Sequence, residues 1–575
     1  MANLSQEKRL RMLSFLETLR KNSQDDVSSI RAINEIEQAL NEKKYGLVWE
    51  VHTERIDTLT VDNILVFNEV SSKRIITKTD DTYNFLLEGD NLHSLKLLEK
   101  THRGLVDIIY IDPPYNTQKN DFMYDDKYVE KDDAYIHSKW LSFMSIRLKY
   151  AREMLSKYGI ICVSIDEKEY SQLKLLMDDI FSESNHLSTH HIQVRYQNKS
   201  LNEDNDWQPV MEYVLIYAKD KSEFSANKPS EEYDLGKFCY DITELTTGES
   251  FVVGGKKVTV FKSGEWKIDK VDNPGVGHLK ETWASGSIVR QSGTAAEFLD
   301  KYLIARKETD GLGCLYKIDN MGEDGLGYRY VSGPKKANAI RGKFYSGVPI
   351  TRIKELELGT AKKTRPIPNF YDFSADVGNI RHEGGVSFNG GKKPIRLLKQ
   401  LINYHPNQNS IVLDFFAGSG STGHAVTELN KQDGGKRRYI LCTNNENNIC
   451  EKITYQRLLN IQDELPHNLK YFKTGLIRKT EDIAITYELL DHIRPLVELQ
   501  YGFNIDNSSM KIFLTEDDFD IFMDSVEVVD LTKIFLASDI MLSAAQERKL
   551  NESACEIIRV PEYYYRDELI ESGDI

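Results

Sequence analysis

The sequence predicts an α/β fold whose centre is a parallel β-sheet covered by helices on both faces. Two largely apolar runs that each end in an acid, Val106–Asp112 and Ile160–Asp166, are typical of strands buried on both sides. A segment with helical apolar spacing, residues 140–159, stands between them. Late in the chain, Pro394–Asn430 gives a helix, a strand, a glycine turn and another helix. Strands that alternate with amphipathic helices in this way indicate a parallel sheet.

The first 221 residues supply N-terminal helices and the first strands of this sheet. Leu10, Leu13, Leu16 and Leu19 recur at near-helical spacing. We therefore expect the first forty residues to form amphipathic helices that pack on the body of the protein or on a partner. The elements that follow are a turn and helix at 88–101, a strand at 106–112, a helix at 140–159, a strand at 160–166 and, after one more helix, a strand at 212–219.

The alternation of apolar strands with amphipathic helices breaks off between about Ser222 and Tyr371. Glycines are frequent there, and short runs such as VVGGKKVTVF and GLGYRYV alternate with loops that mix aromatic and basic residues. We expect a β-rich, irregular module inserted into the α/β fold. The sequence thus predicts five regions: a helical segment at 1–60, one α/β half at 61–221, the insert at 222–375, the other α/β half at 376–470 and an acidic C-terminal domain at 471–575.

Composition is that of a globular protein in water. Of the 575 residues, 40% are hydrophobic and 28% are charged, and no apolar run approaches the roughly 18 to 20 residues of a membrane span. The N-terminus lacks the apolar core of a signal peptide, and six scattered cysteines form no CxxC pair. We expect a cytoplasmic protein without a disulfide framework, a metal site or a membrane partner. The formal charge is −15, yet residues 331–400 carry 14 lysines and arginines against 5 acids, which is compatible with nucleic acid.

A glycine turn follows the strand that ends at Asp414. Such a turn lets a ligand approach the backbone, and the helix after it offers amides to a negative group. No Gly-Lys-Ser/Thr follows, which excludes a P-loop. Taken alone, the turn could also be a plain strand-to-helix connection. It resembles the S-adenosylmethionine loop of Rossmann-like methyltransferases, which implies cofactor contacts from Asp414, Phe416, Ala417, Gly418, Ser419, Gly420, Ser421 and Thr422.

The next strand of the sheet is expected to end beside the ribose of such a cofactor. An acid usually stands there. The sequence YILCTNNEN instead places Thr443 and Asn444 at this position, with Glu446 slightly beyond. Because an amide can hydrogen-bond a diol, the departure is compatible with cofactor binding, and Asn444 is the candidate.

The strand at 106–112 runs into Asp-Pro-Pro-Tyr, which is Asp112, Pro113, Pro114 and Tyr115. The lone pair of an exocyclic amine on a nucleobase is delocalised into the ring and is a poor nucleophile. A carboxylate and a backbone carbonyl that each accept one N–H favour the geometry in which this lone pair attacks a sulfonium methyl group. Asp112 and the Pro113 carbonyl can do this, the prolines stiffen the turn, and Tyr115 would stack on a base that has left the duplex. Taken alone, the motif could also be a turn after a buried strand.

The two turns are expected to face each other, because ligands of open α/β sheets bind beyond the carboxyl ends of the strands where the strand order reverses. With both motifs present, the sequence resembles the amino-methyltransferases of DNA, in the class in which DPPY precedes the FxGxG loop. GDNL at Gly89–Leu92, the segment Trp140–Leu155 and the Lys393-Pro394 helix start match as well. The run DPPYNTxxNDFxYDD together with GIICVSIDE resembles the modification (Mod) subunit of type III restriction–modification systems.

This resemblance implies a Rossmann-like methyltransferase sheet with a circularly permuted motif order, an inserted target-recognition domain and helical extensions. It implies methyl transfer from S-adenosyl-L-methionine to the N6 amine of a flipped adenine in double-stranded DNA. In the family, Asp in the first position of the Asp-Pro-Pro-Tyr motif is usual for adenine enzymes. Lys393, Ser421 and Thr422 are implied to help hold the methionine carboxylate of the cofactor. Cytosine-N4 or RNA-amine methylation and a non-catalytic DNA-specificity subunit are the alternatives.

The resemblance makes the insert the target-recognition domain. Its basic residues are candidates for phosphate contacts, and Tyr345 or Tyr371 for a wedging or stacking contact. The N-terminal helices and the acidic tail are implied to serve homodimer formation and the docking of a restriction helicase–nuclease subunit. The basic candidates are Lys335, Lys336, Arg341, Lys343, Arg352, Lys362, Lys363 and Arg365.

Overall fold

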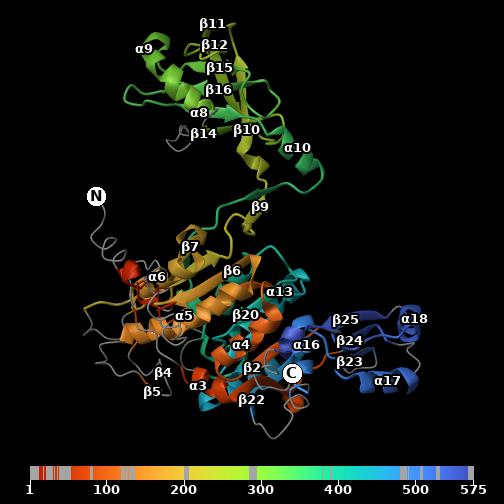
Figure 1. Cartoon of the computed structure of the whole chain (residues 1–575). Coiled ribbons are helices and arrows are strands. Elements are labelled where there is room, and N and C mark those ends of the chain that lie inside the picture. Colours follow the sequence, from red (N-terminus) through yellow and green to blue (C-terminus); the bar gives the residue numbers. More distant parts are fainter. Residues whose placement is uncertain are drawn as a thin grey trace. The chain divides into compact units, whose positions relative to one another are not determined.

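The chain of this computed structural model divides into two units, residues 1–227 with 368–575 and residues 228–367 (Figure 1). The second unit lies within the expected insert, 222–375. Of the expected N-terminal helices, residues 12–16 and 18–20 are helical, and most of the remainder lies outside the described residues. The described residues are 54–77, 82–117, 136–199, 206–283, 294–378, 380–388, 392–479, 491–505, 509–525, 531–553 and 555–566, with short pieces at 12–16, 18–20, 30, 33–34, 36–37, 49, 123–124, 127–128 and 489.

The first unit is built on a ten-stranded sheet, among the described residues, in the order β1-β22-β2-β21-β20-β3-β6-β8-β7-β19. From β22 to β6 all neighbours are parallel, as the continuous apolar runs predict. The two sides differ, because β1 is antiparallel to β22, and β8 is antiparallel to both β6 and β7. The expectation of a purely parallel sheet is therefore corrected to a mixed sheet with a parallel centre. Its strands are β1 (Asn63–Glu69), β22 (Leu469–Arg478), β2 (Asn84–Glu88), β21 (Arg438–Thr443), β20 (Ile411–Asp414), β3 (Val106–Ile111), β6 (Leu155–Ile165), β8 (Met211–Ala218), β7 (His186–Gln193) and β19 (Phe370–Asp372).

The strand order reverses between β20 and β3, at the centre of the sheet. From β20 the chain passes through α13 (Ser421–Asp433) to β21 on one side, and from β3 through α5 (Ile136–Met154) to β6 on the other. Right-handed crossovers that leave in opposite directions place their helices on opposite faces. Helix α5 packs between α4 (Asn91–His102) and α6 (Tyr170–Phe181), while α12 (Ile395–Ile402) packs against α13 (Figure 1).

Helix α4 shows how local sequence sets these elements. Its N-cap is Asp90, whose carboxylate accepts a hydrogen bond from the Leu92 amide at 2.7 Å. The helix then buries Leu92, Leu95 and Leu98 against the sheet. Burial of each leucine contributes about 1.5–3 kcal/mol, so this face fixes the helix on the strands that carry the site. Further elements of the unit are α3 (Arg55–Asp62), β4 (Met123–Tyr124), β5 (Lys127–Tyr128), α11 (Ser374–Gly378), α14 (Gln456–Asn460) and α16 (Ile493–Tyr501).

The second unit is an eight-stranded sheet, in the part of the chain that is described, in the order β11-β12-β15-β16-β17-β14-β10-β13, with antiparallel neighbours. One face packs on α8 (Ala295–Phe298) around Val258, Tyr316 and Val331. Short β9 (Ser230–Glu232) and β18 (Lys362–Thr364) pair where the chain enters and leaves. The other elements are β10 (Phe238–Glu244), β11 (Glu249–Val253), β12 (Lys256–Phe261), β13 (Trp266–Lys270), β14 (Leu279–Trp283), β15 (Leu315–Asp319), β16 (Tyr328–Ser332), β17 (Lys343–Ser346), α9 (Lys307–Asp310) and α10 (Ile350–Glu357).

The C-terminal residues add a small parallel sheet of β23, β24 and β25. Phe519, Ile534 and Leu550 belong to its own apolar cluster. Among the described residues, no helix combines the length and the apolar character that crossing a membrane requires. The elements are β23 (Met510–Phe513), α17 (Glu516–Ser525), β24 (Lys533–Ala537), α18 (Ala544–Glu552) and β25 (Glu556–Val560).

A buried ion pair between β22 and α16 provides a test of the fold. Lys470 Nζ donates to Glu498 Oε2 at 2.5 Å, and both side chains are buried, while Glu69 lies farther away at 3.5 Å. Glu498→Ala leaves the ammonium without its near partner and is expected to lower the free energy of unfolding by about 3–5 kcal/mol. The apolar pair Lys470→Met/Glu498→Leu is expected to lose less. Urea unfolding followed by circular dichroism measures both variants, and a double variant no more stable than the single one would contradict the account.

Candidate active site

Two strand ends form the centre of the site. Strand β3 ends at Ile111 and is followed by Asp112, and β20 ends at Asp414. The two strands are parallel neighbours, with Val412 opposite Ile108, so both carboxylates lie at the same edge of the sheet. Their proximity is visible in their electrostatics, because the charge of Asp112 adds to burial in raising the pKa of Asp414. The structure therefore brings the turn at Asp112–Tyr115, which we call the aspartyl turn, together with the glycine turn, as the sequence predicts.

The aspartyl turn is held on several sides. The Tyr115 hydroxyl donates to Asp112 Oδ1 at 2.7 Å. Trp140 on α5 donates its indole N–H to the Pro114 carbonyl at 2.8 Å. Asn116 adopts a left-handed φ of 58° and its buried amide donates to Glu169 at 2.6 Å. The Pro114 carbonyl therefore already accepts a hydrogen bond within the protein. The predicted contact between the Pro113 carbonyl and the substrate amine stays a prediction.

Two side chains from distant segments complete this cluster. Glu212 stands at the start of β8, and Lys393 lies shortly before α12. Lys393 Nζ donates to the Tyr115 hydroxyl at 2.5 Å and to Glu212 Oε2 at 2.6 Å. It also lies 3.4 Å from Asp112 Oδ1, and the Tyr115 hydroxyl lies 3.2 Å from Glu212 Oε2. These four residues, which we call the carboxylate cluster, form one hydrogen-bonded group. The predicted contact of Lys393 with the cofactor carboxylate stays a prediction.

Sequence reasoning missed Glu212 because it treated residues 212–219 as a further strand of a parallel sheet. The start of a parallel strand lies at the edge opposite to the site. Since β8 is antiparallel to β6, with Tyr213 opposite Ile165, its first residues lie at the carboxyl edge of the central strands. An acid at the start of an apolar strand, in EYVLIYAK, is the signal that could have revealed the reversed direction.

The charges in the carboxylate cluster oppose one another. Burial raises the pKa of Asp112, and the Lys393 ammonium acts against this rise. Burial lowers the pKa of Lys393, but the carboxylates of Asp112 and Glu212 outweigh it and hold that pKa above its ordinary value. Burial, Asp112 and Glu212 all raise the pKa of Tyr115 well above its usual range. Around neutral pH the cluster therefore holds a charged ammonium and a neutral phenol.

The glycine turn is tied back to its own strand. Asp414 Oδ1 accepts from the Phe416 amide at 3.0 Å, and Oδ2 accepts from the Thr422 hydroxyl at 2.5 Å. Gly418 and Gly420 have φ values of 49° and 76°, a region that favours glycine. A Cβ at Gly418 would meet only the Phe416 carbonyl oxygen, at 3.8 Å, so the space before the turn is open to a ligand. Ala417, in the same turn, is buried.

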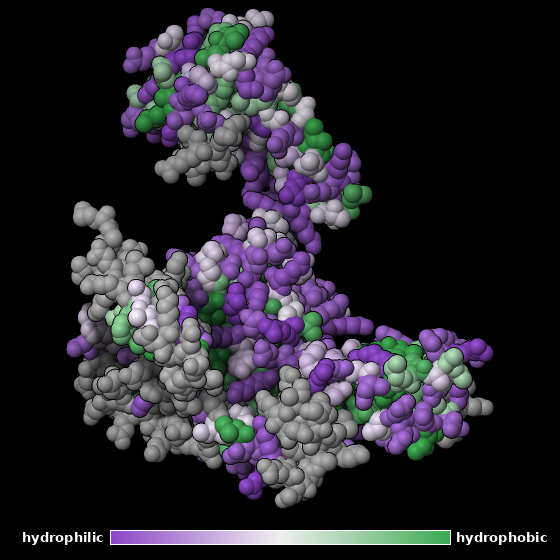
Figure 2. All heavy atoms as spheres, in the orientation of Figure 1, coloured by the Kyte–Doolittle hydropathy of each residue, from purple (hydrophilic) through white to green (hydrophobic). Residues whose placement is uncertain are grey.

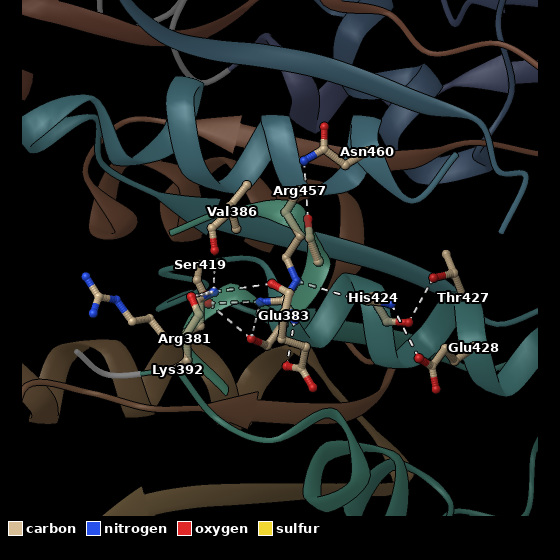
Figure 3. Close-up of polar contacts among 12 residues, drawn as sticks. Arg381, Glu383, Val386, Lys392, Ser419, His424, Thr427, Glu428, Arg457 and Asn460 are labelled. Carbon is tan, nitrogen blue, oxygen red and sulfur yellow. Dashed lines mark hydrogen bonds and ion pairs between the residues drawn. The ribbon is translucent and has the colours of Figure 1, made fainter. Parts of the chain in front are cut away.

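Arg457 supports the glycine turn from behind, a role that sequence reasoning did not find. Its buried guanidinium donates to Ser421 Oγ at 2.8 Å and to Ser419 Oγ at 3.3 Å (Figure 3). It also pairs with Glu383 at 2.9 Å. Lys392 holds the segment that carries Glu383, because its ammonium donates to the carbonyls of residues 381, 383 and 386. The predicted cofactor contacts of Ser419 and Ser421 stay predictions, since both hydroxyls contact Arg457.

A third wall comes from α5 and the GDNL segment. The ring of Phe416 packs on Phe143 at 5.9 Å between centroids, and the Arg147 guanidinium stacks on the Phe143 ring at 3.6 Å. Arg147 donates to Asn91 at 2.6 Å, and Asn91 donates to the Phe415 carbonyl at 3.0 Å. The GDNL segment is therefore joined directly to the glycine turn.

Asn444 follows β21, which is the parallel neighbour of β20, and its side chain is exposed at the same edge. A cavity of about 610 Å³ lies elsewhere, against α13 and the segment after α14, and its lining includes His424, Glu428 and Asn460 but no predicted site residue. In the part of the chain that is described, no group of three His, Cys, Asp or Glu side chains is arranged to hold a metal.

A doubly wound sheet with a glycine turn and a proline-stiffened carboxylate on its two central strands defines the class of Rossmann-like methyltransferases. The family model described as DNA methylase, for N6 and N4 enzymes, matches residues 106–455. The chain belongs to this family.

Curated relatives point in the same direction. The chain is 30% identical over 420 residues to the Mod subunit of the type III restriction–modification enzyme StyLTI from Salmonella typhimurium, covering 68% of this chain and 57% of that protein. It is 28% identical to the type II methyltransferase M.KpnI from Klebsiella pneumoniae, covering 74% of this chain and 99% of that one. The matched region thus spans little more than half of the StyLTI subunit.

Solved structures of DNA methylases are also similar to this chain. A putative DNA modification methylase from Thermus thermophilus, complexed with S-adenosyl-L-methionine, is 10% identical with a TM-score of 0.30, covering 68% of this chain and 97% of that one. The cytosine-N4-specific PvuII DNA methyltransferase is 10% identical with a TM-score of 0.31, covering 73% and 94%.

The buried carboxyl of Asp414 makes stability depend on pH. Burial raises the pKa of Asp414 to about 7, whereas an unfolded chain has a value of about 3.9. The folded state therefore binds this proton more tightly, and its contribution is complete below about pH 4 and is lost as the pH rises through about 7, a change of roughly 4 kcal/mol. The melting temperature of the unaltered chain minus that of Asp414→Asn is expected to fall from pH 5 to pH 8. Scanning fluorimetry at constant ionic strength measures it, and a difference that grows with pH would contradict the assignment.

Proposed function

We propose that the protein transfers a methyl group from S-adenosyl-L-methionine to the N6 amine of adenine in double-stranded DNA, as the modification subunit of a type III-like restriction–modification system. The observation that carries the proposal is the pairing of β3 with β20, which sets Asp112 and the Gly418 turn at one edge of the sheet. Membership of the DNA methylase family and the similarity to Mod subunits support it.

The residues at the glycine turn fit the cofactor. Gly418 leaves the backbone open in front of α13, whose N-terminal amides favour a negative group. Phe416 offers an apolar ring held by Phe143, and Asn444 is exposed at the end of the neighbouring strand. When bound, S-adenosyl-L-methionine supplies an electrophilic methyl group on a sulfonium.

The aspartyl turn supplies the groups that bind and orient the substrate amine. Asp112 accepts one N–H of the flipped adenine and the Pro113 carbonyl accepts the other, while the ring of Tyr115 stacks on the base. The half-buried Asp112 carboxylate stabilises the positive charge that develops on the amine nitrogen as it forms its bond to the methyl carbon. Lys393 and Trp140 hold the turn in place, so the acceptors are aligned before the base arrives.

The second unit is proposed to read the DNA sequence. Figure 2 shows a surface in which hydrophilic residues prevail, as an interface with DNA requires. The lysines at 335, 336, 362 and 363 are exposed, whereas Arg341 and Lys343 pair with acids of the same unit. Tyr345 is buried and bonded to Glu281, so the expectation that it wedges into DNA is wrong for this structure.

Assembly is proposed from similarity. The relatives described as Mod subunits belong to type III restriction–modification enzymes. By that similarity the chain is proposed to form a homodimer and to bind a restriction helicase–nuclease subunit.

Asp112→Asn tests the reaction. The amide keeps the shape of the side chain but carries no negative charge, so methyl transfer is expected to fall on the order of 100-fold or more while cofactor binding is retained. Labelled S-adenosyl-L-methionine and mixed-sequence duplex DNA are the substrates, nucleoside analysis identifies the product, and calorimetry measures cofactor binding. Asp220→Asn, an exposed acid in a turn after β8, is the matched control.

The readouts separate the alternatives. Label recovered as N6-methyladenine supports the proposal. Label recovered as N4-methylcytosine, or in an RNA substrate, would show that the methyl acceptor is that amine and not the N6 amine of adenine. Undiminished labelling by Asp112→Asn overturns the mechanism. An unaltered chain that binds no S-adenosyl-L-methionine is a DNA-specificity subunit rather than an enzyme.

The lysine pair Lys362 and Lys363 on β18 tests the role of the second unit. If both contact phosphates, Lys362→Ala/Lys363→Ala is expected to reduce the slope of log K against log salt concentration by about 2 for duplex DNA. Lys256→Ala/Lys257→Ala on β12 is the matched control. Fluorescence anisotropy at several salt concentrations measures both, and equal slopes for the two variants would remove β18 from the DNA interface.

A further inference from the structure

Methylation of an amine leaves a proton to be removed. When the nitrogen lone pair forms the bond to the methyl carbon, the C–S bond breaks with its electron pair going to sulfur, and the nitrogen becomes cationic. One N–H proton must then depart, and Asp112 is the group proposed to accept from that N–H. A carboxylic acid at the half-buried Asp112 would block the next turnover until its proton moves on. A second acceptor beside Asp112 would restore its carboxylate.

The carboxylate cluster contains a continuous path away from Asp112. The Tyr115 hydroxyl lies 2.7 Å from Asp112 Oδ1 and 3.2 Å from Glu212 Oε2, so it is within hydrogen-bonding distance of both acids. Lys393 cannot take the proton, because its neighbours hold the pKa of its ammonium above the ordinary value. Its hydrogen bonds to the Tyr115 hydroxyl and to Glu212 instead fix the two groups relative to each other.

We propose that Glu212 receives, through the Tyr115 hydroxyl, the proton that the methylated amine gives up to Asp112. This inference rests on the proposed function. Asp112 passes its proton to the Tyr115 oxygen as the Tyr115 hydroxyl passes its own to a Glu212 oxygen. Asp112 is thereby restored as a carboxylate, and Tyr115 is never ionised. Glu212 acts through Tyr115 as the relay acceptor. Lys393 is a positioning residue that holds Tyr115 and Glu212.

Burial and volume give the path its direction. The Glu212 side chain is 25% exposed, against 16% for Asp112, so the accepting end of the path is the more exposed of the two acids. Glu212 and Lys393 also line a cavity of about 40 Å³ beside Phe373 and Leu397. This volume exceeds the roughly 10–15 Å³ that one water needs. The cavity can therefore hold a water in contact with Glu212, to which its proton can pass.

Acids on the neighbouring strands act on both ends of this path. Asp414 at the end of β20 lies close enough to Asp112 for their charges to interact, and Asp166 after β6 interacts with Glu212. Tyr110 on β3 lies in the field of Asp112, Asp414 and Glu212, and its hydroxyl bonds to Ser164. Lys393 pairs with Asp112 and Glu212, whereas Asp166 interacts with Lys168.

Glu212→Gln provides the test, because glutamine keeps the hydrogen-bonding shape but cannot accept a proton. The substrate is a duplex oligonucleotide that carries the site found by sequencing methylated bases in a genome with the gene. Rapid quenching with labelled S-adenosyl-L-methionine measures first-turnover methyl transfer, and a pH indicator in weak buffer measures proton release. In Glu212→Gln we expect proton release at least tenfold slower than methyl transfer by the same variant. Glu212→Asp is expected to restore part of the release rate.

Two further variants sharpen the result. Tyr115→Phe keeps the stacking ring but lacks the hydroxyl, so its proton release is expected to lag as in Glu212→Gln, and the double variant is expected to lag no further. Glu428→Gln is the matched control, since Glu428 also pairs with a lysine of the α12 segment, Lys399, at 2.8 Å. Its proton release is expected to follow methyl transfer without delay.

The outcomes are distinct. Proton release that keeps pace with methyl transfer in Glu212→Gln or in Tyr115→Phe overturns the relay. A fall of more than tenfold in first-turnover methyl transfer by Glu212→Gln, with cofactor binding unchanged, makes Glu212 a support for Asp112 and also overturns the relay. Failure of the unaltered chain to transfer any methyl group overturns the proposed function itself.

Discussion

The parallel pairing of β20 with β3 is the constraint on which the rest of the site depends. Because these strands lie where the strand order reverses, the chain leaves them in opposite directions and no helix crosses the edge between them. Asp112 and the Gly418 turn can therefore both open onto one edge. A shift of one residue in this register would turn the side chains at the ends of the strands to the opposite face. The apolar core on both sides of Leu413 and Ile109 makes such a shift costly.

Placing so many charges at a buried edge lowers stability, and the structure offsets this with specific partners. Lys393 is held between Glu212 and Asp112, and Arg457 between Glu383 and the hydroxyls behind the glycine turn. Replacing buried pairs of this kind by apolar residues often leaves stability unchanged or improves it. Their value here is geometric, because each pair fixes a loop that carries a proposed ligand contact.

Local patterns in the sequence were sufficient for the centre of the fold but not for its edges. The strands at 106–112 and 160–166 and the glycine turn after Asp414 are each encoded by contiguous residues, so their type and their meeting at one edge could be predicted. The apolar residues of β8 do not give its direction, because an apolar strand reads alike in both directions; only the acid at its start carries that signal, and Glu212 was missed for that reason. Arg457 was missed because its role depends on Glu383, a residue far away in the sequence. The burial of Tyr345 depends on strands paired across the second unit.

The inserted unit is joined to the site through the chain on both of its sides. Glu212 precedes it on β8, and Lys393 follows it before α12, so the hydrogen bond between them closes a loop that contains the whole second unit. Parallel pairing of β19 with β7 closes nearly the same loop one strand farther out. Loop-closure entropy rises only slowly with length, which explains how a unit of this size is accommodated between two members of one hydrogen-bonded cluster. The carboxylate cluster is thus complete only when the chain on each side of the insert has returned to the sheet. The acceptor side of the site therefore depends on the chain returning to the sheet after the insert.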